Sequence, residues 1–473
     1  MRKTKIVCTL GPSTDKEGIL EELVIEGMDV ARFNMSHGSY DEQRGRLEQL
    51  KALRKKHNKF VAALLDTKGP EIRIGCFATG KITLEEGQSF TLTTADIEGD
   101  ETQVSITYKK LYRDVKVGDC ILIDDGLIGM EVTEIIGEDI VCVVRNGGEV
   151  SNRKGVNVPG VALKMNFLSQ KDCDDLLFGI QEGFDFVAAS FTRTADDVLE
   201  MRKLLNDNGG RDIQIIAKIE NQQGVDNIDA IIEVADGIMI ARGDLGVELP
   251  LEDIPVIQRD IIQKVYRSGK KVITATQMLD SMMVHPRPTR AETTDVANAI
   301  FQGTSAIMLS GETAAGKYPI EALKTMVRIA VHTEDNIDYN EIFKNEQLLE
   351  ELDITTAISH ATCTTAIDLK AKAILVVSKT GRTARMISKY RPACPIGAGS
   401  TSEQVCRQLS LSWGVFPMKV REEYSSEILC LRAVEAAEKN GLVEEGDMVV
   451  FAGGIPLGIP GRTNLIRVCI VGE

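Results

Sequence analysis

Lys218 and Glu220 stand at the end of an otherwise apolar run and are the residues best placed in this sequence to do chemistry. Residues 213–220 read IQIIAKIE, and a short β-branched run of this kind predicts a strand buried on both faces of a parallel sheet. Two positions apart on an extended chain, the two side chains point to the same side. The carboxyl ends of such strands usually hold ligands. Taken alone, a surface ion pair explains them equally well.

The next two strand-like runs favour a functional site. Residues 237–245 (GIMIARGDL) and 270–279 (KKVITATQML) are apolar runs of the same type. Both end in residues able to bind a ligand: Arg242, Gly243 and Asp244 in the first, Thr274, Thr276 and Gln277 in the second. Three consecutive strands with polar tips at one end converge on one site in a closed barrel, which one accidental ion pair would not explain.

Glu220 and Asp244 offer two carboxylates at neighbouring strand ends, with no histidine or cysteine nearby in the sequence. Oxygen ligands alone favour a hard cation, Mg²⁺ or Mn²⁺, that completes its shell with water or substrate oxygens. Beside such an ion, Lys218 could stabilise an enolate or a phosphoryl group in transfer. Simple pairing with Glu220 is the plainer alternative. A Schiff base is disfavoured because the carboxylates keep the amine protonated.

A second cluster follows the second and third predicted strands. Arg32 offers a planar fork for phosphate or carboxylate. Asn34 and Ser36 share its face, and with Asp66 and Thr67 they supply four oxygen ligands and one negative charge, enough for a monovalent cation. Such residues are also common as turn and cap residues, which is the competing interpretation.

Composition limits the partners. The chain has 473 residues, 43% of them hydrophobic and 26% charged, and a formal net charge of −15. A soluble globular protein is expected, and nucleic acid and anionic membranes are excluded as main partners because both reward basic surfaces. The ten cysteines form no Cys-x-x-Cys pair, so reduced thiols in the cytoplasm are expected. No run approaches the roughly 20 apolar residues that span a bilayer.

Strand and helix patterns alternate along the first two thirds of the chain. Eight strands are predicted: residues 5–10, 29–33, 60–65, 184–190, 213–220, 237–245, 270–279 and 305–309. Short alternating runs with turn residues, from about residue 71 to 160, predict a small antiparallel β-domain inserted after the third strand. This organisation predicts an α/β fold, a (β/α)8 TIM barrel. A doubly wound open sheet is the alternative, but polar tips on most strands favour the barrel.

Three domains follow from this pattern. We expect the barrel in residues 1–70 and 169–340, the inserted β lid domain in 71–168, and a small C-terminal α/β regulatory domain in 341–473. In the last of these, helices are predicted at 355–369 and 383–390, and strands at 373–377, 447–451 and 465–471. The turn between its first strand and second helix is hydroxyl-rich and basic, and it could cradle a phosphate or simply cap the helix: Ser378, Lys379, Thr380, Gly381, Arg382 and Thr383.

Over essentially its full length the chain resembles the pyruvate kinase family. The stretches that carry the resemblance are residues 5–12, 31–38 (ARFNMSHG), 65–73 (LDTKGPEIR), 154–160 (KGVNVPG), 215–221 (IIAKIEN), 239–248 (MIARGDLGVE), 273–280 (ITATQMLD), 286–295 (PRPTRAETTD) and 308–313 (MLSGET). The resemblance implies phosphoryl transfer from phosphoenolpyruvate to ADP, giving pyruvate and ATP, the last step of glycolysis. It also implies Mg²⁺ (or Mn²⁺) and K⁺ as cofactors and a homotetramer. No appended phosphohistidine-like domain is expected after Glu473.

The resemblance also implies roles at matching positions. Lys218 matches the lysine that stabilises the transferring phosphoryl group and the enolate. The other matches are Glu220 and Asp244 with the Mg²⁺ ligands, Arg32, Gly243, Asp244 and Thr276 with the groups that hold phosphoenolpyruvate, Asn34, Ser36, Asp66 and Thr67 with the K⁺ ligands, and Arg73 and Lys154 with nucleotide-phosphate contacts. Thr276 also matches a position near the methylene carbon that is protonated. Glu71 matches the acidic residue of K⁺-dependent members, so K⁺ activation is predicted.

Within the family, the turn 378–383 and a late glycine-rich loop, residues 453–463 here, bind a sugar-phosphate effector. Fructose 1,6-bisphosphate and other sugar phosphates stay open as its identity. Two other functions compete with the kinase: a Mg²⁺-dependent lyase or aldolase acting on pyruvate enolate, and a metabolite sensor without catalysis. Arg73, Lys154 and the inserted domain argue against the first, and the presence of Lys218, Glu220 and Asp244 argues against the second.

Overall fold

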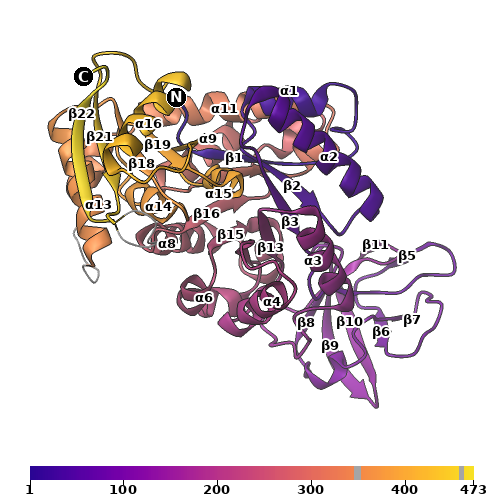
Figure 1. The fold of residues 1–473 in the computed structure, drawn as a ribbon. Helices are drawn as coiled ribbons and strands as arrows, with labels where there is room; N and C mark the ends of the chain where they lie inside the picture. The colour runs from indigo at the N-terminus through magenta and orange to yellow at the C-terminus, as the bar shows by residue number, and fades with distance from the viewer. Residues whose placement is uncertain (346–352, 457–462) are drawn as a thin grey trace.

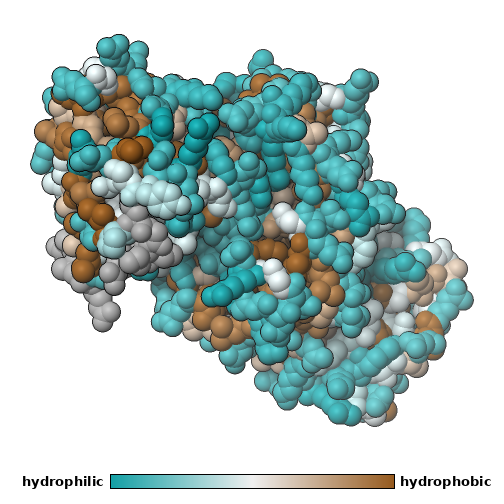
Figure 2. Space-filling model, in the orientation of Figure 1, coloured by the Kyte–Doolittle hydropathy of each residue, from teal (hydrophilic) through white to brown (hydrophobic). Residues whose placement is uncertain are grey.

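The computed structural model describes residues 1–345, 353–456 and 463–473. A closed barrel lies in the middle of the molecule, with an inserted β-module at one end and a five-stranded sheet at the other (Figure 1). The face seen in Figure 2 is mostly hydrophilic, as expected for a chain with 26% charged residues. Among the described residues, no helix combines the length and the apolar character needed to cross a membrane.

Eight parallel strands close the barrel in the order β1-β17-β16-β15-β14-β13-β3-β2. They are β1 (Lys5–Thr9), β2 (Val30–Asn34), β3 (Ala62–Asp66), β13 (Phe186–Ala189), β14 (Gln214–Ile219), β15 (Gly237–Ala241), β16 (Lys271–Ala275) and β17 (Ala306–Leu309). Every residue of β1, β3, β15 and β16 is buried, because helices cover the outside and apolar side chains fill the inside. The predicted eight-stranded barrel is confirmed.

Two predicted strands are too long at their carboxyl ends. The run predicted at 237–245 leaves the sheet after Ala241, and helix α7 (Arg242–Glu248) begins at the next residue. Leu245, the last residue of the predicted run, lies on α7 and packs into the core, which explains an apolar residue at this position. Similarly, β16 ends at Ala275, and the next two residues take positive φ angles of 69° and 52°. Buried residues after these strands extend the apolar pattern without extending the sheet.

Helices between the strands form the outer layer of the barrel. They include α1 (Ile19–Glu26), α2 (Tyr40–His57), α3 (Gln170–Glu182), α4 (Ala195–Asp207), α6 (Ile228–Val234), α8 (Ile254–Arg267), α9 (Arg290–Phe301) and α11 (Pro319–Asp335). Four of them, α2, α3, α4 and α9, begin with capping boxes in which a Ser or Thr and an acidic residue three positions on satisfy free backbone N–H groups. These local signals fix where each helix starts and hence how long the strand-to-helix loops are.

The inserted β-module, called the lid below, lies between β3 and β13, after the third barrel strand as predicted. Its main sheet has the order β4-β12-β8-β9-β10-β6-β7, and β11 pairs with β5. The strands are β4 (Ile72–Arg73), β5 (Lys81–Leu84), β6 (Ser89–Thr93), β7 (Gln103–Ser105), β8 (Cys120–Ile123), β9 (Ile128–Ile136), β10 (Asp139–Asn146), β11 (Gly148–Ser151) and β12 (Gly155–Asn157). The ladders are antiparallel as expected, except that β6 and β7 run parallel.

The C-terminal sheet has the order β20-β19-β18-β21-β22, with only β22 antiparallel. Its strands are β18 (Ala373–Val377), β19 (Ile396–Ser400), β20 (Val415–Lys419), β21 (Met448–Gly453) and β22 (Leu465–Ile470), with α13 (Ile354–Asp368), α14 (Arg382–Ser388), α15 (Glu403–Leu409) and α16 (Ser426–Lys439) between them. This sheet packs on the amino-terminal end of the barrel, where Lys5 Nζ donates to the Val415 carbonyl (2.6 Å) and Arg407 Nε contacts Asp185 Oδ1 (2.8 Å). The opposite, carboxyl end faces the lid.

Candidate active site

Lys218 lies at the centre of a buried cluster at the carboxyl end of the barrel. Its amine is 2.9 Å from Glu220 Oε1 and 3.2 Å from Asp66 Oδ1. It also donates a hydrogen bond to Ser190 Oγ at 2.8 Å. Lys218 is 8% exposed and Glu220 1% exposed. The three charged side chains come from β3 and β14 and the residue that follows β14, so the polar strand tips do converge.

Asp66 is shared by two cations. Arg32 Nε donates to Asp66 Oδ2 at 2.5 Å, and Arg32 Nη1 donates to Thr9 Oγ1 at 3.0 Å. Burial by itself would raise the pKa of Asp66, but Arg32 and Lys218 outweigh it and hold the pKa below its usual value. Asp66 is therefore a fixed negative charge that aims Arg32 and Lys218 into the site.

Burial by itself would also lower the pKa of Lys218, yet Asp66 and Glu220 raise it above the usual lysine value. The amine therefore stays charged. A protonated amine is a poor nucleophile, and a Schiff-base role for Lys218 loses its chemical basis. A fixed cation is instead suited to stabilise an anion that forms nearby.

Glu220 is buried, and one of its two carboxylate oxygens lacks a hydrogen-bond donor. Its Oε2 accepts the backbone N–H of Phe191 at 2.6 Å, while its Oε1 is buried and has no aligned hydrogen-bond donor, although Lys218 Nζ is close. Burial, reinforced by the charge of Asp244, raises the pKa of Glu220 to about 7. A divalent cation at Oε1 would satisfy that oxygen and favour the ionised form. The donor set therefore fits a hard cation.

Asp244 lies on the first turn of α7, and that turn is tied to the end of β16. The Gly243 N–H donates to Thr276 Oγ1 at 2.7 Å, and Arg242 Nη2 donates to the Thr276 carbonyl at 2.7 Å. Arg242 is itself held by Asp295 at 2.7 Å. Helix α7 therefore begins at Arg242, directly after β15, and these contacts fix its first turn, which carries Asp244, against the end of β16.

No group of three or more His, Cys, Asp or Glu side chains within the described parts of the chain is arranged to hold a metal ion. A cation held by Glu220 and Asp244 would therefore take its remaining ligands from water or substrate oxygens, as the sequence predicts. This arrangement is typical of Mg²⁺ sites that also bind a phosphate or carboxylate substrate.

The candidate monovalent-cation ligands also come together. Asn34 and Asp66 face each other in the register of β2 and β3, and Thr67 follows directly. Thr67 Oγ1 donates to the Ala188 carbonyl at 3.2 Å, and Asn34 Oδ1 accepts the Ser36 N–H at 3.0 Å. Each of these oxygens keeps a further lone pair for a cation. Ser36 is exposed on the turn after β2.

A cleft separates the barrel rim from the lid and contains about 1190 Å³ of empty space, counting its open mouth. Residues of both parts line it, among them Glu71, Asn157, Phe191, Asn221, Asp244 and Glu248. Asn157 Nδ2 donates to Glu248 Oε1 at 2.8 Å, which ties the lid to α7. Asp244 thus faces a space large enough for a nucleotide.

Arg73 and Lys154 lie on the lid beside this cleft and not in the Lys218 cluster. Lys154 directly precedes Gly155, which pairs with Arg73 in the ladder between β12 and β4. Both cations already have carboxylate partners: Arg73 Nη2 is 2.7 Å from Glu71 Oε1, and Lys154 Nζ is 2.9 Å from Asp124 Oδ1. A bound polyphosphate would have to compete with these carboxylates.

Sequence reasoning missed two residues that orient the cluster. Ser190 accepts the hydrogen bond of Lys218 and donates to Asp66 Oδ1 at 3.1 Å. Phe191 holds Glu220 through its backbone, with a φ of 54° that a bulky residue rarely adopts. Ser190 ends the fourth predicted strand, so the rule of polar strand tips could have found it. The Phe191 backbone leaves no such signal in the sequence.

In the C-terminal domain, residues 378–381 form the turn between β18 and α14, and Arg382 and Thr383 are the first two residues of α14. Gly381 precedes the helix with a φ of 73°, and Thr383 Oγ1 is 2.8 Å from Thr463 Oγ1 in the late loop. Lys379 Nζ is 3.0 Å from Glu422 Oε1, and Arg382 Nη2 is 3.6 Å from Asp353 Oδ2. The two predicted effector segments therefore meet at Thr383. Residues 457–462 of the late loop lie outside the described residues.

The chain has three parts: a closed barrel, an inserted lid over a lysine–carboxylate cluster, and a C-terminal α/β sheet. Together they define a phosphotransferase-like barrel enzyme. Residues 1–323 match the family model of the pyruvate kinase barrel domain, and residues 356–469 match that of the pyruvate kinase alpha/beta domain. The chain belongs to the pyruvate kinase family.

Its curated relatives agree over the whole chain. A pyruvate kinase of Clostridium acetobutylicum is 51% identical over 472 residues, which is 100% of both chains. Pyruvate kinases of Sporosarcina psychrophila and of Staphylococcus aureus strain MRSA252 are 49% and 47% identical, and each match covers 100% of this chain and 81% of the relative. This confirms the resemblance seen in the sequence motifs.

Proposed function

We infer that the Lys218 cluster is where this chain carries out the reaction of its family, the transfer of the phosphoryl group of phosphoenolpyruvate to ADP, which gives pyruvate and ATP. The observation that carries this inference is a buried, permanently charged lysine held by Asp66, Glu220 and Ser190 beside Arg32. Phosphoryl transfer depends on positioning and charge neutralisation more than on a protein nucleophile. The cluster supplies two fixed cations and no activated nucleophile.

We propose that Glu220 and Asp244 hold one Mg²⁺ or Mn²⁺, which supplies positive charge beside the substrate when it is bound. Arg32 and the backbone at Gly243 bind the phosphate and carboxylate of phosphoenolpyruvate. Lys218 stabilises the charge that builds up on the transferring phosphoryl group and on the enolate oxygen. Thr276, held by the Gly243 N–H, lies beside the carbon that takes the final proton.

K⁺ is proposed at Asn34, Ser36, Asp66 and Thr67. Its charge would add to those of Arg32 and Lys218 around the phosphoenolpyruvate phosphate. Glu71 supports this assignment because it matches the acidic residue that K⁺-dependent members of the family carry. In addition, we propose that Arg73 and Lys154 bind the nucleotide phosphates from the lid, exchanging their contacts with Glu71 and Asp124 for phosphate oxygens.

A coupled assay for pyruvate with phosphoenolpyruvate, ADP, Mg²⁺ and K⁺ tests this function. Pyruvate that appears only when ADP is present is the expected result, together with an equal amount of ATP. Pyruvate formed from another precursor without ADP would support a lyase or aldolase instead. No turnover under any of these conditions would support a sensor without catalysis.

We also propose that residues 378–383 bind a sugar phosphate as an activator, in a cytoplasmic homotetramer. The contact between Thr383 and Thr463 supports this, since it joins the two segments expected to hold that ligand. Adding fructose 1,6-bisphosphate or another sugar phosphate to a phosphoenolpyruvate saturation curve should shift the curve to lower concentrations. The shift should disappear in Lys379→Gln. An unshifted curve with every sugar phosphate would end the proposal.

A further inference from the structure

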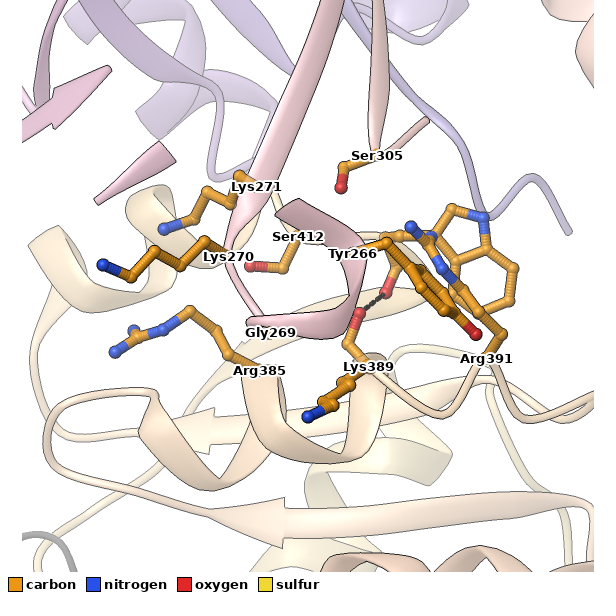
Figure 3. A pocket seen from close by; sticks show the side chains of 11 residues that line it. Tyr266, Gly269, Lys270, Lys271, Ser305, Arg385, Lys389, Arg391 and Ser412 are labelled. Carbon is orange, nitrogen blue, oxygen red and sulfur yellow. Dashed lines mark hydrogen bonds between the residues drawn. The ribbon is translucent and has the colours of Figure 1, made fainter. Parts of the chain in front are cut away.

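A basic cavity lies between the barrel and the C-terminal domain, at the end of the barrel opposite the Lys218 cluster (Figure 3). It contains about 280 Å³ of empty space, including its open mouth. The barrel contributes the end of α8 and the start of β16, and the C-terminal domain contributes α14 and the segment before β20. Five basic side chains and no acidic one line it: Lys270, Lys271, Arg385, Lys389 and Arg391.

Lys270, Lys271 and Arg385 each donate hydrogen bonds to neutral oxygens. Lys271 Nζ donates to Gln214 Oε1 at 2.6 Å, and Arg385 Nη1 donates to the Thr380 carbonyl at 3.0 Å. Lys270 Nζ donates to three backbone carbonyls at the end of α6, those of Ile232, Glu233 and Ala235. Within the described residues, none of the three has a carboxylate at ion-pair distance. Asp236 is the acid whose field reaches all three, and Arg202 already pairs with it.

Burial makes this concentration of charge costly. Lys271 is 3% exposed, and its burial, together with the charges of Arg385 and Lys270, lowers the pKa of Lys271 to about 7. Close like charges in a buried place destabilise each other unless a counter-charge arrives. Figure 3 shows the charged ends of Lys270, Lys271 and Arg385 pointing to the same side of the cavity. A bound anion on that side would meet Lys271 and Arg385, while Lys270, whose three protons go to backbone carbonyls, would add its charge at longer range.

A neutral group also lacks its partner here. The hydroxyl of Ser412, a residue that is 3% exposed, lines the cavity and has no hydrogen-bond partner among the described residues. A buried hydroxyl without a partner is unusual in a folded protein. Ser412 comes from the C-terminal domain and Lys271 from the barrel, so one oxyanion between them could accept from both.

We propose that this cavity is an anion site that takes one doubly charged oxyanion of phosphate size, bridging the barrel and the C-terminal domain. The enclosed part of the cavity is about the size of one water molecule. A single phosphoryl head therefore enters only when the lysine side chains move outward, and any organic part of the ligand stays at the open mouth. Lys389 and Arg391 follow the carboxyl end of α14, whereas the effector turn lies at its amino end. Arg385 lies between the two places and contacts the turn through the Thr380 carbonyl.

The only tryptophan of the chain gives the site its own reporter. Trp413 lines the cavity, and the guanidinium carbon of Arg391 lies 4.4 Å from the centre of its ring. Tryptophan fluorescence should therefore change when an anion reorganises the cations around it. Inorganic phosphate is titrated into the full chain without substrates, against sodium chloride at matched ionic strength. Ribose 5-phosphate forms a second arm that distinguishes free phosphate from a phosphate ester.

We expect a saturable fluorescence change with phosphate, matched by a calorimetric binding signal, and absent with chloride. Lys271→Met and Arg385→Gln should each weaken the apparent affinity at least tenfold, because charge-assisted hydrogen bonds are strong. Lys379→Gln, at the effector turn, should keep the Trp413 fluorescence response to phosphate, because Trp413 lines this cavity. A Trp413 response that saturates at lower concentrations of ribose 5-phosphate than of phosphate, and that persists in Lys379→Gln, would identify an ester as the natural ligand.

Three results would overturn the proposal: no saturable signal by either method, unchanged affinity in both Lys271→Met and Arg385→Gln, or loss of the Trp413 fluorescence response in Lys379→Gln. Circular dichroism and thermal melting confirm that each variant is folded, and Arg385→Gln suffices if Lys271→Met does not fold. Because the titration uses no substrates, its outcome is independent of the proposed phosphotransfer.

Discussion

Lys218→Met removes the cation at the centre of the active-site cluster while keeping a side chain of similar length. Asp66 keeps Arg32 as its partner in this variant, but Glu220 loses the amine 2.9 Å from its Oε1. Since the pKa of Glu220 is already about 7 with Lys218 present, the carboxyl will be protonated at neutral pH without it. Protonation avoids most of the roughly 3–5 kcal/mol that an unpaired buried charge would cost. The variant should therefore fold.

Turnover should fall much more than stability. Removing a single neutral donor that stabilises a transition state typically costs about 10²–10³ in kcat, roughly 2.7–4 kcal/mol. Lys218 carries a full charge in a buried site, and without it the Glu220 carboxyl is less ionised. We therefore expect kcat to fall by at least about 10³-fold. Nucleotide binding should change little, because Arg73 and Lys154 on the lid are untouched.

The coupled pyruvate assay at saturating phosphoenolpyruvate, ADP, Mg²⁺ and K⁺ measures kcat, and fluorescence with a labelled nucleotide measures binding. Lys55→Met is the matched control, since Lys55 is exposed on α2. The control should turn over normally. A Lys218→Met enzyme with near-normal kcat, or one that loses nucleotide binding as strongly as turnover, would refute the role given to this amine.

Ser190→Ala removes the 2.8 Å hydrogen bond that orients Lys218, which is worth about 1 kcal/mol. The kcat should therefore fall about fivefold, while KM for phosphoenolpyruvate stays nearly unchanged. An unaltered kcat would mean that this contact does not orient the amine. Replacing K⁺ by a bulky organic cation should abolish most of the activity, whereas full activity in K⁺-free buffer would contradict the cation site at Asn34, Ser36, Asp66 and Thr67. Burial, with Arg385 and Lys270, lowers the pKa of Lys271 to about 7, so its charge is lost as the pH rises above that value. Sulfate keeps two negative charges between pH 6 and pH 8, so a change in its affinity over this range reports on the protein. Its affinity, measured by Trp413 fluorescence, should weaken from pH 6 to pH 8 in the unmodified chain but not in Lys271→Met. Equal pH profiles in the two proteins would exclude Lys271 as the titrating group.

Much of the barrel could be predicted from apolar runs, because each buried parallel strand is a nearly continuous stretch of such residues. The polar residues at the ends of most strands predicted that the sheet closes into a barrel. The carboxyl ends of β15 and β16 were predicted less accurately than the strands themselves. Leu245 of α7 continues the apolar pattern of β15, and Met278 and Leu279 continue that of β16, because all three are buried outside the sheet.

Two strands of the C-terminal sheet gave no clear signal. β19 reads IGAGS, with two glycines that have low strand propensity, and the edge strand β20 contains Pro417. Their place in the sheet is decided by tertiary packing. In the parallel neighbour β18, by contrast, the residues AILVV predict the strand correctly.

In the active site, the side chains were predictable and the backbone was not. Lys218, Glu220, Asp66 and Arg32 follow strand ends, so barrel closure alone brings them together. Asp66 was assigned only to a cation site, yet it also pairs with Arg32 and Lys218, and the sequence contains no sign of that geometry. The positive φ angles of Phe191 and Thr276 depend on contacts with Glu220 and Gly243 that exist only in the folded chain.

Binding of Mn²⁺, followed by electron paramagnetic resonance, tests most directly whether Glu220 and Asp244 hold one cation beside Lys218. We expect one Mn²⁺ at the active site of each chain, with an affinity that falls at least tenfold in Glu220→Gln and in Asp244→Asn, since each removes a charged ligand of the ion. Glu233→Gln, at an exposed position on α6, should bind Mn²⁺ normally. Unchanged Mn²⁺ binding in both active-site variants would contradict a shared cation site.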